Sequence, residues 1–221
     1  MKYSYRFVIV VAVFITCLLT ANIIGVKIIS AGPFLFPAAV IIFPVSYIFG
    51  DVLTEVYGYR LARRVIWLGF VCNLIMVIFI WFGQLMPAAP FWKDQPAYVS
   101  ILGYTPRLLV ASFLGYLVGE FANSFVLAKM KILTKGRWLW TRTIGSTFVG
   151  QAFDTSLFIT VAFIGTPSFV PILILYHWSA KVLIEAIATP FTYWIVGVLK
   201  RTETIDTYDY QTNFNPFLVK E

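Results

Sequence analysis

The sequence predicts an all-α integral membrane protein in which six transmembrane helices form one bundle and both termini lie in the cytoplasm. The composition is 60% hydrophobic and only 12% charged, whereas soluble proteins average about 25% charged. The mean hydropathy is +0.83. Apolar runs long enough to cross a bilayer, which takes about 20 residues, alternate with short basic connections. We expect one transmembrane domain at residues 1–201, followed by a short, mobile cytoplasmic tail at 202–221.

The expected spans are residues 7–24, 34–50, 62–86, 108–129, 143–164 and 170–199. With these spans, thirteen of the seventeen Lys and Arg residues fall on one side of the membrane. Cytoplasmic connections carry the excess of Lys and Arg in membrane proteins, so this side is expected to be cytoplasmic. An even number of spans then brings both termini to that side.

Two features affect individual spans. The first span follows a basic start, as a signal peptide would, but residues 19–23 offer no good small-residue cleavage site, so we expect a retained anchor. Pro37 and Pro44 interrupt the second span, and Pro190 interrupts the sixth. Each proline removes a helix hydrogen bond, which predicts kinks in both helices. Such kinks serve either to line a cavity or only to pack the bundle.

Three segments place polar side chains at positions i and i+3 directly after a glycine. The pairs are Asp51 and Thr54, Glu120 and Asn123, and Gln151 and Asp154. On a helix this spacing puts both side chains on nearly one face, and the glycine allows a neighbouring backbone to approach closely. A carboxylate at bilayer mid-depth costs roughly 2.5 to 3.5 kcal/mol, so these residues should face the bundle interior. We expect the three faces to converge.

The sixth span adds an acid and a base four residues apart, Lys181 and Glu185. They could form a local ion pair that holds the bundle together. However, three acids are expected within the bilayer against this one cation; they are Glu120, Asp154 and Glu185. At least two of them therefore carry a proton, pair with an interfacial cation such as Lys27 or Arg142, or await a donor-rich ligand.

The connection between the second and third spans, residues 50–64, is rich in charges. Asp51 and Glu55 share a helical face, Gly58 can end that helix, and Arg60 follows. Either these groups form an ion-paired topogenic turn, or they act as a gate whose pairs break and reform, with Arg142 as a further cation.

The composition excludes several other functions. One His and two dispersed Cys cannot supply a zinc-type ligand set, so we expect no metal, and no cofactor is indicated. The basic residues are scattered between apolar spans and follow topology, which excludes nucleic acid as a partner. The expected partners are the lipid bilayer and a small molecule, and the sequence leaves open whether the chain forms a homo-oligomer.

The segment 50–64, together with residues 21–27, 119–123 and 142–154, resembles the queuosine precursor transporter family, also described as a vitamin uptake transporter family. The Asp-x-x-Thr-Glu-x-Tyr-Gly motif at residues 51–58 is its most specific element, and the resemblance covers nearly the whole chain. The resemblance implies six helices in the bacterial inner membrane and uptake of 7-deazaguanine precursors of the tRNA nucleoside queuosine.

That substrate class suits the residues. A 7-deazaguanine presents an N–H and an amino group side by side, which one carboxylate can accept as a two-bond fork. We expect Asp154 or Glu120 to accept the fork and Gln151, Asn123 or Asn22 to face the carbonyl. Aromatic candidates for stacking on the base are Phe153, Phe148, Tyr116 and Trp178. Gln151 and Asp154 are the first candidates, and Lys181 and Glu185 complete the expected site.

Transport by alternating access is the expected mechanism, and two alternatives remain. The chain could be the substrate-binding subunit of an energy-coupling vitamin transporter, docking through the small residues Ala12, Thr16 and Thr20. It could also be an intramembrane enzyme that uses Glu120 and Asp154 for acid–base chemistry, although H-E-x-x-H and G-x-S-x-G motifs are absent.

Overall fold

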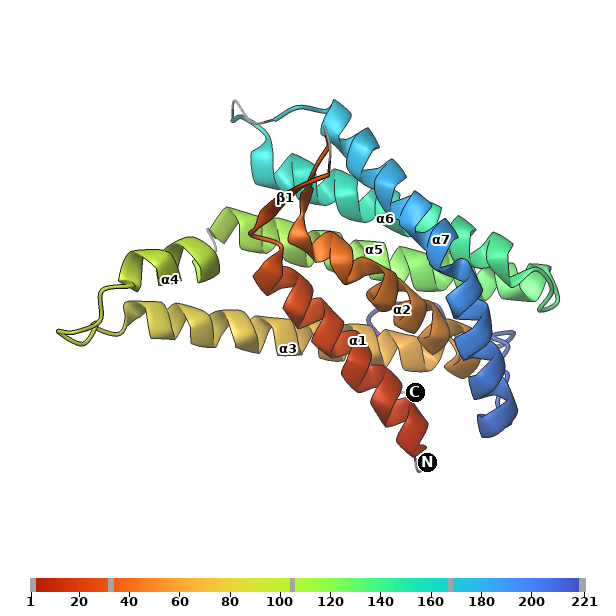
Figure 1. Ribbon diagram of the computed structural model, residues 1–221. Coiled ribbons are helices and arrows are strands. Elements are labelled where there is room, and N and C mark those ends of the chain that lie inside the picture. The colour runs from red at the N-terminus through yellow and green to blue at the C-terminus, as the bar shows by residue number, and fades with distance from the viewer. Residues whose placement is uncertain (1–2, 32–33, 104–105, 167–168, 219–221) are drawn as a thin grey trace.

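The computed structural model describes residues 3–31, 34–103, 106–166 and 169–218. Its helices are α1 (Tyr5–Ile24), α2 (Phe43–Tyr57), α3 (Tyr59–Leu85), α4 (Gln95–Leu102), α5 (Pro106–Leu133), α6 (Leu139–Phe163) and α7 (Ile172–Glu203). A short hairpin, β1 (Ile28–Ala31) and β2 (Phe34–Pro37), and the 3-10 helix η1 (Ala38–Ile41) connect α1 to α2. In Figure 1, α3, α5 and α6 run along the bundle, and α1, α2 and α7 cross them at a slant.

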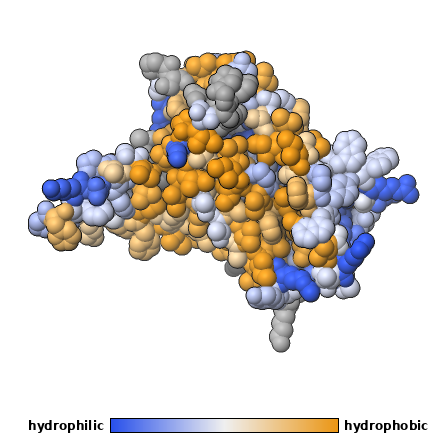
Figure 2. Space-filling model, viewed as in Figure 1, coloured by the Kyte–Doolittle hydropathy of each residue, from blue (hydrophilic) through white to orange (hydrophobic). Residues whose placement is uncertain are grey.

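Four helical stretches of the described chain are long and apolar enough to cross a membrane: Tyr5–Ile24, Tyr59–Leu85, Gln95–Leu133 and Ile172–Glu203. Exposed apolar side chains such as Phe79 and Trp194 project from these helices toward the space that lipid would occupy. Figure 2 shows the apolar surface across the middle of the molecule and hydrophilic residues gathered at its two ends. The chain is a multi-pass helical membrane protein.

The prediction of one helix at residues 34–50 is wrong. Residues 34–37 form strand β2, residues 38–41 form η1, and the helix begins only at Phe43. Pro44 occupies the first turn of α2, where its missing N–H leaves no hydrogen bond unmade, so it starts the helix and does not kink it. Helix α2 consequently extends beyond the expected span, to Tyr57, and ends at Gly58, whose φ is +86°.

The polar motif at residues 51–57 therefore lies inside a helix whose last eight residues, from Gly50, are all buried. One further span differs in detail from expectation. Helix α6 is 25 residues long but is not among the four candidate spans, and its buried face carries Gln, Ser and Thr side chains. Helix α7 continues through Pro190 as one helix, and the kink expected there stays a prediction.

The two ends of the chain lie together at one end of the bundle (Figure 1). Arg6 near the start of α1 and Glu203 at the end of α7 form an ion pair with an N–O distance of 3.4 Å. We call this the basic end of the bundle; its cations include Arg60 and Arg64 at the start of α3, Lys129 near the end of α5, and Lys135 and Arg137 between α5 and α6.

The segment after α7 was expected to be a mobile tail, but residues 204–218 fold back onto the basic end, while 219–221 lie outside the described residues. The Thr207 N–H donates to the carbonyl of Val56 at 3.2 Å. The Asp209 carboxylate accepts the N–H of Tyr59 at 3.0 Å and thereby caps the first turn of α3. Polar tail residues are thus held by backbone groups that the ends of α2 and α3 leave unpaired.

Candidate functional site

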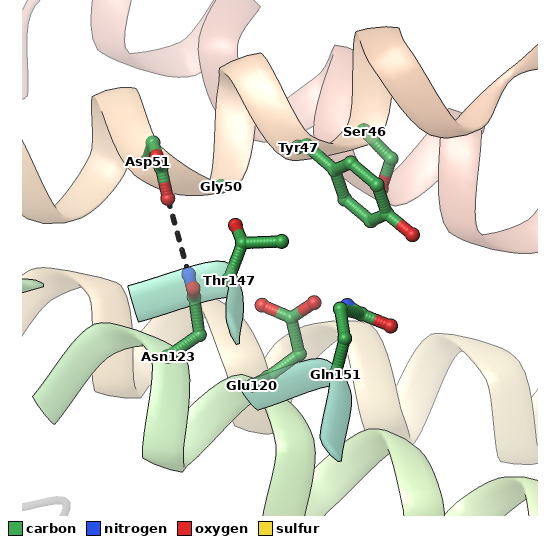
Figure 3. Close-up of a pocket in the computed structure, with 8 residues that line it drawn as sticks. All are labelled: Ser46, Tyr47, Gly50, Asp51, Glu120, Asn123, Thr147 and Gln151. Carbon is green, nitrogen blue, oxygen red and sulfur yellow. Dashed lines mark hydrogen bonds between the residues drawn. The ribbon is translucent and has the colours of Figure 1, made fainter. Parts of the chain in front are cut away.

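A small polar cavity lies between α2, α5 and α6 (Figure 3). Its lining residues are Ser46, Tyr47, Gly50, Asp51, Glu120, Asn123, Thr147 and Gln151. The structure therefore brings together one or both members of each polar pair that follows a glycine. The cavity volume is about 10 Å³, which is the space of roughly one water-sized sphere.

Glycines bring α5 and α6 close enough to form this wall. A Cβ atom on Gly150 would lie 2.7 Å from the Cβ of Asn123, and one on Gly119 would lie 2.7 Å from the Cβ of Asp154. Either side chain would collide with the facing helix, so only glycine permits this separation between the two backbones. The polar residues next to these glycines are held against the neighbouring helix as a result.

One hydrogen bond crosses the cavity, from Asn123 Nδ2 on α5 to Asp51 Oδ1 on α2, at 3.1 Å. Figure 3 shows this bond and the side chains of Tyr47 and Glu120 facing the same space. Within the described residues, Asp51 Oδ2, Asn123 Oδ1 and Gln151 Oε1 are buried and have no hydrogen-bond partner. Each such acceptor costs about 1 to 3 kcal/mol when left unsatisfied. The cavity is therefore rich in acceptors and suited to a ligand that supplies N–H groups.

Asp154, one turn beyond Gln151 on α6, lies beside the cavity and forms an ion pair with Lys181 of α7. The distance from Lys181 Nζ to Asp154 Oδ2 is 2.5 Å, and both side chains are mostly buried. The same ammonium group lies 5.5 Å from the ring centroid of Phe43. Lys181 thus reaches across to α6, and the ion pair that the structure gives it is with Asp154 and not with Glu185, the local partner that the sequence left open.

Glu185 is fully buried on α7, and neither of its carboxylate oxygens has a hydrogen-bond partner within the described residues. It is not among the residues that line the cavity. Helix α7, which carries Glu185, nevertheless packs against α2, one of the helices that line the cavity. Of the residues predicted for the site, Glu120, Asn123 and Gln151 therefore line the cavity, whereas Glu185 does not.

Two residues of the predicted site lie elsewhere. Asn22 Nδ2 donates to Asn73 Oδ1 at 2.8 Å and joins α1 to α3. Phe153 is half-exposed on the outer side of α6, because it lies about 200° around the helix from Gln151 at roughly 100° per residue. Among the other stacking candidates, Phe148 is also half-exposed, and the Tyr116 hydroxyl donates to the carbonyl of Ile66.

The aromatic residue that does line the cavity is Tyr47, which sequence analysis missed together with Ser46 and Thr147. A signal was present, because Tyr47 precedes Asp51 by four residues and so shares its helical face. It was overlooked because residues 34–50 were interpreted as one apolar span.

At the basic end, four helices and the tail meet in a buried charge cluster centred on Glu55 of α2. Arg142 of α6 donates to both Glu55 oxygens at 2.8 Å, and Lys200 of α7 donates to Oε1 at 2.6 Å. Lys131 of α5 lies 3.7 Å from the same oxygen. Asp206 of the tail accepts from Lys131 at 2.5 Å and from Lys200 at 2.8 Å. Three cations and two acids thus tie α2 to the rest of the bundle.

Burial alone would raise the pKa of the Asp206 carboxyl, but the hydrogen bonds from Lys131 and Lys200 outweigh it and lower that pKa below its usual value. Of the four residues expected to form a gate, Glu55 and Arg142 are paired in this cluster. Asp51 instead lines the cavity, and Arg60 is exposed at the start of α3.

Comparison with known proteins agrees with the resemblance seen in the sequence. A "Probable queuosine precursor transporter" of Bacillus subtilis (strain 168) is 34% identical over 148 residues, 65% of this chain and 64% of the relative. A "Queuosine precursor transporter" of Escherichia coli (strain K12) is 25% identical over 143 residues, 65% of this chain and 61% of the relative. The match thus spans less than two thirds of either relative, and no solved structure matches.

The family model described as "Putative vitamin uptake transporter" matches residues 37–195. This range includes all the residues that line the cavity, as well as Glu55, Arg142, Asp154 and Lys181. The chain therefore belongs to the vitamin uptake transporter family.

Proposed function

We propose that this chain imports a 7-deazaguanine precursor of queuosine, which it binds in the cavity between α2, α5 and α6 and releases by alternating access. The observation that carries the proposal is the set of buried acceptors without donors around this cavity. A purine-like base rich in N–H groups satisfies such a set, and relatives of the chain are named queuosine precursor transporters.

Glu120 is the best candidate for the two-bond fork to the base. It lines the cavity, whereas Asp154 is already engaged by Lys181 at 2.5 Å. An amide such as that of Gln151 can both donate to the base carbonyl and accept from a ring N–H. Tyr47 provides the aromatic surface on which the base would stack. The site is thus proposed to use one side chain from each of α2, α5 and α6.

The cavity of about 10 Å³ is far smaller than the roughly 300 Å³ or more of a small-molecule site. The structure corresponds to a closed conformation in this proposal, and the helices must separate to admit the base. Helices α5 and α6 are held together by glycine contacts. We therefore infer that α2 is the helix that moves away from them.

The charge cluster around Glu55 would control that movement at the basic end. Breaking the contacts from Arg142, Lys131 and Lys200 to Glu55 releases α2 from α6, α5 and α7 together. By the positive-inside rule the basic end is cytoplasmic, so this opening would deliver the base to the cytoplasm. In a bacterial cell this orientation corresponds to import across the inner membrane.

A binding assay on the purified chain tests the function. The panel contains 7-cyano- and 7-aminomethyl-7-deazaguanine and, as the matched control, the analogue that lacks the 2-amino group. We expect binding of at least one deazaguanine and a loss of about fivefold or more for the control, because a stranded carboxylate costs about 1 to 3 kcal/mol or more. Equal binding of the control analogue would contradict the proposed fork.

The second test of the function measures uptake of the base into liposomes that contain only this chain. Transport by the chain alone is expected for a self-sufficient carrier. Binding without transport would instead indicate a substrate-binding subunit that needs an energising partner.

A further inference from the structure

The buried acids around the cavity outnumber the cations that could neutralise them. Lys181 is committed to Asp154 at 2.5 Å. Asp51, Glu120 and Glu185 form no ion pair within the described part of the chain, although Asp51 accepts one hydrogen bond from Asn123. Three acids, of which Asp51 and Glu185 are buried and Glu120 is half-buried, are therefore left without a counter-ion in the closed conformation.

Among these acids, Glu185 has the least access to water or to a hydrogen-bond donor. Its side chain is fully buried, and both carboxylate oxygens lack a hydrogen-bond partner among the described residues. An ionised carboxylate in such a place costs several kcal/mol, because neither water nor a donor stabilises the charge. The neutral acid avoids most of this cost. Glu185 therefore carries a proton in the closed conformation.

Titratable groups reach the region of the cavity from each helix around it. Tyr47 and Asp51 of α2 and Glu120 of α5 line the cavity, and Asp154 of α6 is paired with Lys181, one turn before Glu185 on α7. Asp51 lies on α2, the helix that packs against α7, and it lines the cavity. We therefore expect a proton on Glu185 to reach water through Asp51 and the cavity when α2 moves.

We propose that Glu185 carries the proton that couples import of the base to the proton gradient. This proposal rests on the proposed transport function. With the cavity open to the outside, the ionised Glu185 carboxylate takes a proton from external water, and the neutral acid permits closure. With the cavity open at the basic end, the O–H bond breaks and the proton passes to cytoplasmic water. One proton then enters with each base.

A metal-ion coupling site has less support. No group of three or more His, Cys, Asp or Glu side chains that could hold a metal ion occurs within the described residues. Glu120 and Asp51 are also less suited to the role, because Glu120 is proposed to bind the base and Asp51 is held by the Asn123 amide. Glu185 is the remaining buried acid, because it has no proposed role in binding the base.

The experiment uses the full chain, purified and reconstituted alone into liposomes, with the membrane potential clamped by valinomycin and equal potassium. Radiolabelled 7-cyano- and 7-aminomethyl-7-deazaguanine serve as substrates. Three quantities are measured: counterflow exchange without a gradient, accumulation with the outside one pH unit more acidic, and proton entry reported by a trapped pH dye. For one proton per base, one pH unit sustains about tenfold accumulation.

Glu185→Gln mimics the neutral acid and cannot release a proton. We expect it to retain counterflow at the wild-type rate and to lose both accumulation and proton entry. Glu203→Gln, which removes an acid from the far end of the same helix, is the matched control and should retain all three activities. Accumulation that survives in Glu185→Gln overturns the proposal, as does wild-type transport that follows a sodium gradient without proton entry.

A chemical measurement on the wild-type chain tests the proposal even if the Glu185→Gln variant does not fold. A hydrophobic carbodiimide reacts with protonated buried carboxyls, so it should label Glu185, identified by mass spectrometry, and should abolish accumulation. Absence of label at Glu185 overturns the proposal. If the wild-type chain shows no counterflow with either base, the transport function itself fails, which is a different result from counterflow without proton entry.

Discussion

The guanidinium of Arg142 on α6 binds both carboxylate oxygens of Glu55 on α2, each at 2.8 Å, in a place where neither side chain is exposed. A two-bond fork of this kind fixes the relative orientation of the two helices as well as their distance. It also joins the two helices that carry opposite walls of the cavity. The geometry of the cavity and the charge cluster at the basic end are therefore mechanically linked through α2.

The first prediction concerns removal of the central acid. Glu55→Gln leaves Arg142, Lys131 and Lys200 close together without the carboxylate that they share. Breaking a buried ion pair from one side costs about 3 to 5 kcal/mol, because the remaining charge stays buried. We expect a clearly lower melting temperature of the detergent-purified protein, measured by intrinsic tryptophan fluorescence.

Glu203→Gln is the control for this change. It breaks a single ion pair of 3.4 Å with the half-exposed Arg6, whose charge can turn to water when the pair is lost. We therefore expect a smaller loss than for Glu55→Gln, which strands buried cations. Equal melting temperatures for the two variants would show that the Glu55 cluster does not hold the bundle together.

The second prediction concerns the contact between α5 and α6. Gly150→Ala adds a methyl group where the Cβ of Asn123 lies 2.7 Å away, so the two helices must move apart. Overpacking of this kind costs about 1 to 3 kcal/mol. Gly197→Ala on α7 is the matched control, because a Cβ there meets no atom within 4 Å. Thermal melts should show a loss for Gly150→Ala and no loss for Gly197→Ala, and the reverse order would contradict the packing argument.

Helical spacing made part of this site predictable from the sequence. Polar residues at i and i+3 after Gly119 and Gly150 share a face because the helix period is a local property of the backbone. The choice of partner for Lys181 was not predictable in the same way. Glu185 is its neighbour along α7, but Asp154 on α6 receives the ammonium group. That choice depends on how α7 is rotated against α6, which is a property of the tertiary structure.

The start of α2 shows a different limit. The apolar run at residues 34–50 is compatible with a strand or a helix, because short apolar runs lack a distinguishing period. Pro44 was taken as a kink within a helix, whereas it marks the first turn of one. The tail at residues 202–221 was predicted to be mobile, but the Asp206 carboxylate contacts Lys131 and Lys200. These residues are far apart in the sequence, so no local pattern encodes the contact.

The third prediction concerns the proposed binding site. Gln151→Leu keeps the approximate size of the side chain but removes its amide, so the base loses a donor and an acceptor. We expect an affinity loss of about 1 to 3 kcal/mol, which is roughly five-fold to more than a hundred-fold in the dissociation constant. Isothermal titration with the deazaguanine that the wild-type chain binds measures this loss.

Phe153→Leu is the control for Gln151→Leu, because the half-exposed Phe153 ring lies on the same helix but points away from the cavity. Its affinity should equal that of the wild-type chain. Comparable losses in both variants would indicate a general disturbance of α6 and would remove Gln151 from the site.

The fourth prediction concerns pH and the docked tail. The pKa of the Asp206 carboxyl is lower in the folded protein than in the unfolded chain, because Lys131 and Lys200 favour its ionised form. Its contribution to tail docking is therefore fully present above the unfolded value of about 3.9 and is lost as the pH falls through the folded value. We expect an acid-stable protease to cleave residues 204–218 faster below that range than at neutral pH, and Asp206→Asn to be cleaved faster already at neutral pH. Gln211→Ala, a change at an exposed position elsewhere in the tail, is the control. If Asp206→Asn is cleaved no faster than this variant at neutral pH, the carboxylate does not hold the tail.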